Sequence, residues 1–285
     1  MDLSNYNWYY REEMLQALGL IQTGYYHQHS SVMDIDSSVS LETMIQSHIK
    51  TRINMWIQSP LEDTIWIRGS RHGVWTPTSQ NTLEAAYAKV ISDKAEIPNV
   101  FYFYSLRYPV YHYQPEPSKG EMLLDMVKSI IVQLVMLLSE QPIYTDIDLS
   151  TERFLRLTDP GVSISTALSL LRDIRVFGPP YLNCIVEGLE KVESPTDTRH
   201  TQNLLRTLLE LSKHEPALAS NVQFEDYVVA KINRACFTST GSVGVLDNMV
   251  NAGRVEKVVR TPYLSTARAY VLPTTYSLPE DDGFY

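Results

Sequence analysis

Apolar residues along this chain follow two different spacings. Short continuous apolar runs, typical of buried strands, are centred on residues 65–67, 101–104, 182–186 and 235–238. Longer stretches with apolar residues three or four positions apart predict helices over residues 78–92, 118–138, 165–176 and 201–214. Strands that alternate with helices of this length are typical of βαβ units. The pattern therefore predicts a three-layer α/β domain with a mostly parallel sheet covered on both faces.

The two ends of the chain follow different patterns. Helical spacing over residues 9–20 and 41–56 is interrupted by a polar stretch at 27–38 that is typical of a loop. After the last predicted strand the periodic signal weakens, and the final residues are polar. We therefore predict a helical N-terminal segment (1–60), the α/β domain (61–260) and a solvated C-terminal tail (261–285).

Composition and charge narrow the possible functions. The 285 residues are 44% apolar and 20% charged, which excludes a disordered or fibrous chain. The net charge of −9 repels phosphate backbones, and no block of Lys or Arg offsets it, so we expect no general nucleic-acid binding. The longest apolar run, 129–138, is too short to span a bilayer, and residues 1–14 lack a secretory pattern. We expect an intracellular protein, cytoplasmic or nuclear, without membrane insertion.

Three residue types have functional as well as structural interpretations. Cys184 and Cys236 lie on predicted strands, where buried inert thiols are favoured over a redox pair. His27 and His29 have no evident third partner for a metal ion, so a solvated loop is favoured and no metal site is predicted. The eighteen tyrosines suit a protein interface and a packed core equally well.

The residues after the predicted strands are the candidates for a binding site, because ligands of parallel α/β sheets lie beyond the carboxyl ends of the strands. The sequence TIWIRG at 64–69 resembles the approach to the phosphate-binding loop of fungal NACHT-type signalling NTPases. FYFYSLR at 101–107, the helix at 123–138, CIVEGLEK at 184–191 and FTST at 237–240 follow in the order of that family. The last two resemble its Walker B and sensor segments. This resemblance implies a P-loop NTPase fold.

The phosphate-binding loop departs from the family's pattern. A P-loop needs flexible glycines, a lysine for the β- and γ-phosphates, and a Ser or Thr hydroxyl for Mg²⁺. Gly69 and Thr76 stand at the first glycine and the metal-ligand position, but Val74 replaces a second glycine and Trp75 replaces the lysine. The remaining members of this candidate site are Arg71, His72 and Gly73.

The Walker B and sensor positions depart as well. The resemblance implies a Mg²⁺-binding aspartate and a water-polarising glutamate, where this chain has Glu187, Glu190 and Lys191. Glu187 keeps a carboxylate for weak metal binding, although a polar loop at the strand exit also explains these acids. Lys191 cannot act as a base, and Thr240 stands in place of the sensor arginine. Such losses are expected to slow phosphoryl transfer by several orders of magnitude.

The sequence therefore predicts a pseudo-NTPase without catalytic residues or cofactor, which works as an interaction or scaffold module for another protein. The alternative is an atypical ATP- or GTP-binding switch that holds Mg²⁺ through Thr76 and Glu187 and hydrolyses weakly or not at all. For the interface we predict the loop at 107–117, where Tyr108, Tyr111 and Tyr113 stand among prolines that restrict its conformations.

Overall fold

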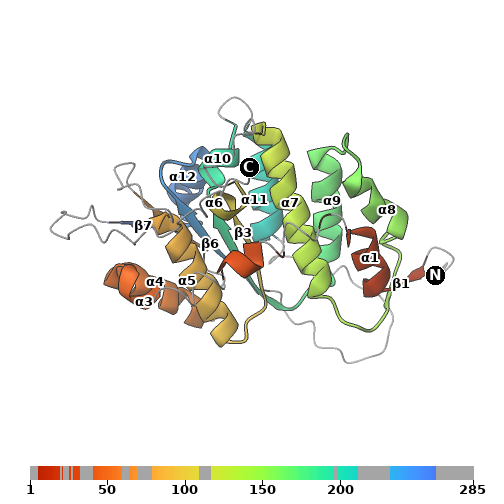
Figure 1. Cartoon of the computed structure of the whole chain (residues 1–285), viewed down its shortest axis with the longest axis horizontal. Coiled ribbons are helices and arrows are strands. Elements are labelled where there is room, and N and C mark those ends of the chain that lie inside the picture. The colour runs from red at the N-terminus through yellow and green to blue at the C-terminus, as the bar shows by residue number, and fades with distance from the viewer. Residues whose placement is uncertain are drawn as a thin grey trace, which may run out of the picture.

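The structure is a computed structural model that describes residues 6–19, 21, 26, 28–32, 41–59, 64–69, 79–108, 117–194, 198–210 and 232–260. Helices flank a central sheet (Figure 1). The strands are β1 (Asn7–Tyr9), β2 (Thr64–Arg68), β3 (Asn99–Phe103), β4 (Ile143–Thr145), β5 (Tyr181–Glu187), β6 (Ile232–Ser239) and β7 (Glu256–Val259). The helices are α1 (Arg11–Ala17), α3 (Leu41–Met44), α4 (Ser47–Gln58), α5 (Gln80–Lys94), α6 (Tyr104–Arg107), α7 (Lys119–Met136), α8 (Thr151–Leu155), η1 (Arg156–Thr158), α9 (Ile164–Arg175), α10 (Leu189–Val192), α11 (Arg199–Glu210) and α12 (Gly244–Asn251).

Five strands form the central sheet in the order β3-β5-β6-β2-β7, and every neighbouring pair is parallel. The register aligns Arg68 of β2 with Ser239 of β6, and Glu187 of β5 with Thr238 of β6. The carboxyl ends of β2, β6 and β5 therefore lie side by side at one edge of the sheet. The prediction of an α/β domain with a mostly parallel sheet is confirmed.

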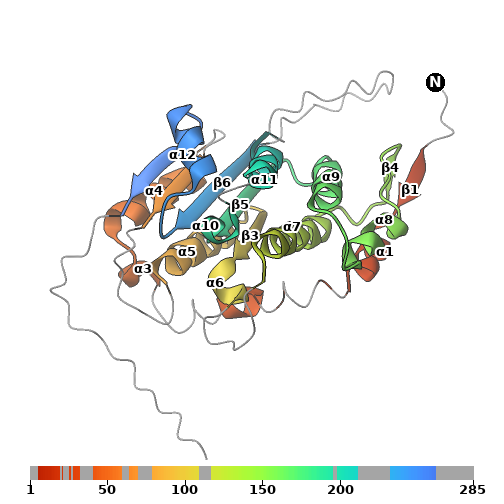
Figure 2. The same cartoon turned by 90° about the horizontal axis from the view of Figure 1, so that it is seen from above.

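Alternate residues of the strands enter two separate cores, because successive side chains of a strand point to opposite faces. Trp66, Tyr102 and Phe237 belong to the core shared with α7, α9, α11 and α12. Ile65 and Phe103 belong to the core shared with α4 and α5. Figure 2 shows these two helical layers on either side of the sheet. Burial on both faces explains why the strands are almost continuously apolar in sequence.

A second, two-stranded sheet pairs β1 with β4 in antiparallel fashion. This β1/β4 ribbon lies at the end of the molecule opposite β7 (Figures 1 and 2). On its inner face Tyr9 and Ile143 pack against the first core, and Thr145 is buried. Trp8 and Tyr144, which are paired directly across the strands, are exposed on the outer face.

Most predicted elements are confirmed. The four apolar runs lie in β2, β3, β5 and β6, and the four helical stretches correspond to α5, α7, α9 and α11. Helix α7 begins with a capping box, in which Ser118 and Glu121 each accept a hydrogen bond from the other's backbone N–H. Tyr104 was predicted as the last strand residue but begins α6, so β3 ends one residue earlier.

Two predictions for the N-terminal segment are wrong. Tyr9 belongs to β1 and the helix begins at Arg11, because the distant strand β4 supplies a backbone partner that local periodicity does not reveal. Within the predicted loop, residues 28–32 are helical. Gln28 is buried there, and its side-chain oxygen accepts a hydrogen bond from the Phe103 backbone N–H at 3.1 Å. The predicted tail at 261–285 lies outside the described residues.

Candidate functional site

The topology identifies the carboxyl ends of β2 and β6 as the place for a ligand. The connection after β2 runs through α5 on one face of the sheet, whereas the connection after β6 runs through α12 on the other face. In open parallel sheets, ligands bind where neighbouring strands send their connections to opposite faces. This switch point lies between Gly69 and Thr240, two residues of the predicted site.

Gly69 follows β2 directly at the switch point. Its backbone N–H donates to the Ser239 carbonyl at 2.7 Å, which continues the contact between β2 and β6. A Cβ atom on Gly69 would lie 2.7 Å from Nη1 of Arg260 and 3.0 Å from Oδ1 of Asn81. The glycine therefore makes room for the Arg260 guanidinium. The other loop candidates lie outside the described residues: Arg71, His72, Gly73, Trp75 and Thr76.

Arg260, just after β7, holds a buried carboxylate of α5. Its Nε and Nη2 atoms lie 2.9 and 2.6 Å from the two carboxylate oxygens of Glu84, whose side chain is completely buried. Nη2 also donates to Asn81 Oδ1 at 2.5 Å. Burial raises the pKa of Glu84, and the Arg260 guanidinium opposes that rise. The Arg260 guanidinium that packs against Gly69 is thus already engaged in an internal ion pair.

Glu187 ends β5, and its side chain is only 3% exposed. Ser105 of α6 donates its backbone N–H to one carboxyl oxygen at 2.9 Å and its hydroxyl to the other at 2.7 Å. Burial raises the pKa of Glu187 to about 7 in spite of these two donors. At neutral pH the carboxyl is therefore protonated in about half of the molecules, and both of its oxygens accept hydrogen bonds from Ser105. Mg²⁺ prefers ionised carboxylates with free oxygens, so this residue does not fit a Mg²⁺ ligand.

Gly188 turns the chain from β5 into α10. Its φ of +84° lies in the left-handed region, and a Cβ atom there would lie 2.5 Å from the Cβ of Tyr104. Both the backbone conformation and the close approach require glycine at this position. The glycine in the Walker B-like segment thus has a packing role at the exit of the strand.

Glu190 and Thr240, predicted in two different motifs, are in direct contact. The backbone N–H and the hydroxyl of Thr240 donate to Oε1 of Glu190 at 3.1 and 2.7 Å. Oε2 of Glu190 is buried and has no hydrogen-bond partner in the part of the chain that the structure describes. Lys191, the next residue of α10, is exposed. The fold therefore gathers Glu187, Glu190 and Thr240 at one edge of the sheet and leaves Lys191 at the surface.

Glu193 supplies a third carboxylate that fastens neighbouring segments together. Its two oxygens accept hydrogen bonds from the backbone N–H groups of Gly244 and Val245, at 2.8 and 2.9 Å. These N–H groups begin α12 and have no partner within the helix, so the carboxylate stabilises the helix start. Together with Glu187 and Glu190, it gives the acids after β5 a structural explanation.

Tyr108 packs onto its own domain. Its ring lies 5.2 Å from that of Tyr104, and its hydroxyl donates to Asp125 of α7 at 3.2 Å. Arg107 and Tyr102 donate to the same carboxylate. Burial raises the pKa of Tyr108 to about 12. Tyr108 is half-buried, which corrects the prediction that it is exposed. Tyr111 and Tyr113 lie outside the described residues, so the interface role of the loop stays a prediction.

The two cysteines are free and buried, as predicted. Cys184 pairs in register with Ala235, one position before Cys236, so the thiols point to opposite faces of the sheet and enter different cores. Burial raises the pKa of Cys184 to about 12 and raises that of Cys236 still further. Neither thiol is therefore suited to redox chemistry.

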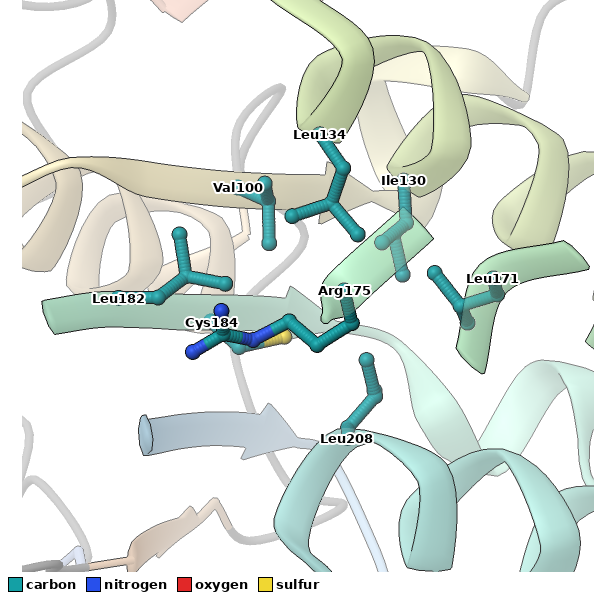
Figure 3. A pocket seen from close by; sticks show the side chains of 8 residues that line it. All are labelled: Val100, Ile130, Leu134, Leu171, Arg175, Leu182, Cys184 and Leu208. Atoms are coloured by element: carbon teal, nitrogen blue, oxygen red, sulfur yellow. The ribbon is translucent and has the colours of Figure 1, made fainter. Parts of the chain in front are cut away.

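A small cavity lies between β3, β5 and the helices α7, α9 and α11 (Figure 3). Its volume is about 10 Å³, which is room for about one water molecule. Arg175 extends along it beside Cys184, and burial lowers the pKa of this guanidinium to about 10. The lining residues are Val100, Ile130, Leu134, Leu171, Arg175, Leu182, Cys184 and Leu208. A space of this size cannot hold a nucleotide.

Within the described ranges, no group of three or more His, Cys, Asp or Glu side chains is placed to hold a metal ion. His29 is half-buried beside the Phe101 ring, and His27 lies outside those ranges. No helix in the described part of the chain combines the length and the apolar character needed to cross a membrane.

No family model matches this chain, and no curated protein is significantly similar to it. The resemblance to NACHT-type NTPases therefore stays a prediction that depends on the motifs and their order along the sequence. The coarser conclusion, an α/β domain with a five-stranded parallel sheet, comes from the structure itself.

Three residues that organise this edge of the molecule are not predicted from the sequence: Arg260, Ser105 and Asp125. Arg260 binds Glu84 from 176 positions away, and Ser105 binds Glu187 from 82 positions away. Ser105 had one signal, its place at the end of a predicted strand, where polar side chains meet those of neighbouring strands. Arg260 and Asp125 had none, because their partners are defined only by the tertiary contacts.

Proposed function

We propose that this chain is a non-catalytic protein-interaction module built on a P-loop-type α/β domain that has lost its nucleotide chemistry. Two features support the P-loop type. The motif-like segments follow one another in family order, and β2, β6 and β5 are adjacent in the sheet. This adjacency brings the loop after β2 and the residues after β5 and β6 to one edge, as a phosphate site at a switch point requires.

The loss of catalysis is supported above all by Glu187. This residue stands where the family resemblance implies the Mg²⁺-binding carboxylate, yet it is buried, has a pKa near 7 and binds Ser105 through both oxygens. Arg260, whose guanidinium packs against Gly69, is engaged with Glu84. Phosphoryl transfer depends on ionised carboxylates, metal and free cations around the phosphates. The described residues of the switch point instead use these groups to hold the domain together.

Nucleotide titration tests this proposal. A ligand that binds only the folded state increases the free energy of unfolding, by about 2.7 kcal/mol at a concentration of one hundred times its Kd, and so raises the melting temperature. We expect no rise with Mg-ATP or Mg-GTP up to about 1 mM, the upper end of ordinary substrate affinities. We also expect no phosphate release. A rise of several degrees, or turnover that Glu187→Gln abolishes, would overturn the proposal.

A variant with a restored loop separates the fold from the chemistry. Val74→Gly combined with Trp75→Lys returns the flexible glycine and the phosphate-binding lysine to their positions. On a P-loop-type scaffold this double variant should bind Mg-ATP or Mg-GTP more tightly than the natural chain. Trp75→Ala in the Val74→Gly background is the matched control, because it removes the indole without adding a charge. Identical nucleotide responses in both variants would argue against the P-loop type.

One observation favours the alternative, an ATP- or GTP-binding switch. Oε2 of Glu190 is buried without a partner among the described residues, and Glu190 lies close enough to raise the pKa of Glu187. Two neighbouring carboxyl groups of this kind attract a cation. This alternative would be established if the natural chain bound nucleotide in a Mg²⁺-dependent way and Glu190→Gln weakened that binding. Against it, a single free carboxylate oxygen falls well short of the octahedral oxygen shell that Mg²⁺ demands.

A further inference from the structure

The outer face of the β1/β4 ribbon is aromatic where a ribbon of this kind is ordinarily polar. Tyr6, Trp8 and Tyr10 are spaced two residues apart along an extended backbone, and Tyr144 lies opposite Trp8 on β4. These four side chains are 38%, 59%, 46% and 45% exposed. An antiparallel ribbon with one face packed on a core normally turns polar residues toward water. In this ribbon, four aromatic side chains are instead exposed on the outer face.

The rings form one connected surface. The ring centroid of Tyr144 lies 5.2 Å from that of Tyr6 and 4.7 Å from that of Trp8, each tilted by 35°. The ribbon is anchored from behind by Tyr9 and Ile143, which pack against the first core. A surface held in this way is ordered before it meets a partner, so binding costs little conformational entropy.

The segments that flank this aromatic face are acidic. Residues 11–13 and 140–148 carry five carboxylates: Glu12, Glu13, Glu140, Asp146 and Asp148. Their only cation is Arg11, which lies 3.4 Å from Glu12 and 3.3 Å from Glu140 and also donates to the Leu138 carbonyl. Asp148 additionally faces Arg153 and Arg156 of the next helical turns. Glu13 and Asp146 are exposed, so the segments next to β1 and β4 present net negative charge to a partner.

The ribbon also offers backbone groups to a partner. The sheet contains two strands among the described residues, so each strand pairs on one side only. A strand edge of this kind can accept an extended peptide, whose main chain adds a further strand while its alternate side chains reach the face of the sheet.

We propose that the outer face of the β1/β4 ribbon binds an extended, lysine- or arginine-rich segment of another protein. The cationic side chains lie over the faces of Trp8 and Tyr144, which attract cations through the ring electrons. The flanking carboxylates bind neighbouring cations, and the peptide backbone extends the ribbon. This inference depends on the proposed interaction function and specifies the chemistry of the partner.

A titration with defined peptides tests the inference. The probe is a decapeptide of alternating lysine and threonine, and its counterpart replaces every lysine by glutamate. Calorimetry should show binding of the basic peptide alone, with an affinity that falls as salt is added. Trp8→Ala and Tyr144→Ala should each weaken binding about tenfold, as loss of a cation–π contact implies. Tyr181→Ala is the matched control, because that tyrosine is 50% exposed on β5 outside the ribbon and its loss should leave binding unchanged.

Three results would overturn the inference: no binding of the basic peptide, equal binding of the acidic peptide, or equal binding by the ribbon variants and Tyr181→Ala. Binding of a neutral oligosaccharide such as cellohexaose in place of the basic peptide would also overturn it, since aromatic faces bind sugars as well. Circular dichroism confirms that each variant is folded. A nucleotide titration on the same samples keeps the two proposals apart, because nucleotide binding contradicts the pseudo-NTPase assignment and leaves the peptide result intact.

Discussion

The carboxyl edge of the central sheet and the outer face of the β1/β4 ribbon differ in whether their candidate functional side chains are bonded within the domain or exposed to a partner. At the sheet edge, Glu187, Glu190 and Arg260 have the chemistry of a phosphate site, but each binds a neighbouring part of the same domain. On the ribbon, Trp8 and Tyr144 have the chemistry of a core, yet they face outward. Residue type alone therefore does not mark a functional site. The side chains left over after internal bonding are the ones available to a partner.

The largest effect is expected from breaking the buried pair at the sheet edge. Arg260→Met leaves the Glu84 carboxylate buried without its cation, which costs about 3–5 kcal/mol of stability. Urea denaturation measures the loss. Arg52→Met is the matched control, because Arg52 pairs with Glu256, whose side chain is 52% exposed, and such pairs contribute about 0–1 kcal/mol. Similar losses in the two variants would mean that the sheet edge is not held together by its buried charges.

A pH-dependent effect is expected at Glu187. Folding raises the pKa of this carboxyl from 4.5 to about 7, so the folded state holds the proton more tightly than the unfolded state. Its contribution to stability is fully present below the unfolded pKa and is lost as the pH rises through 7. Glu187→Gln keeps the side chain neutral at every pH.

Relative to the natural chain, Glu187→Gln should therefore gain stability as the pH rises from about 5 to about 8, by up to about 3 kcal/mol. Urea midpoints measured at several pH values give the comparison. If the stability difference between Glu187→Gln and the natural chain does not change with pH, Glu187 is ionised in the folded protein and is again a candidate metal ligand.

A smaller effect is expected at Tyr108. Tyr108→Phe removes the hydroxyl that donates to Asp125 and should cost about 1 kcal/mol of stability. Tyr181→Phe removes an exposed hydroxyl and should change stability by less than about 0.5 kcal/mol. If the two variants lose the same amount of stability, the Tyr108 hydroxyl does not stabilise the domain, and Tyr108 is again an interface candidate together with Tyr111 and Tyr113.

The smallest effect on stability is expected at the ribbon. Trp8→Ala removes one exposed cross-strand aromatic contact, worth about 0.2–1 kcal/mol. Thermal unfolding should therefore change little, while the affinity for the basic peptide falls about tenfold. A stability loss as large as that of Arg260→Met would mean that the aromatic face belongs to the core, and would remove the contrast between the two regions.

Several features of the fold could be read from local sequence. The apolar runs that form β2, β5 and β6, the helix α7 and its Ser118–Glu121 capping box depend on neighbours a few positions apart, and these predictions are confirmed. The strand ending at Glu187 also placed that carboxyl at the carboxyl edge of the sheet. The protonation state of this carboxyl could not be predicted from the sequence, because its pKa depends on burial by residues from distant segments.

The alternation of strands and helices can be read from the chain alone, because it follows from the spacing of apolar residues. Three features depend on the folded chain: the strand order β3-β5-β6-β2-β7, the pairing of Arg260 with Glu84 across 176 positions, and the outward face of the β1/β4 ribbon. Each of these depends on which distant segments meet, and long-range contacts leave no periodic trace in the sequence. A carboxylate or an aromatic ring therefore acquires its role only when its partners are in place.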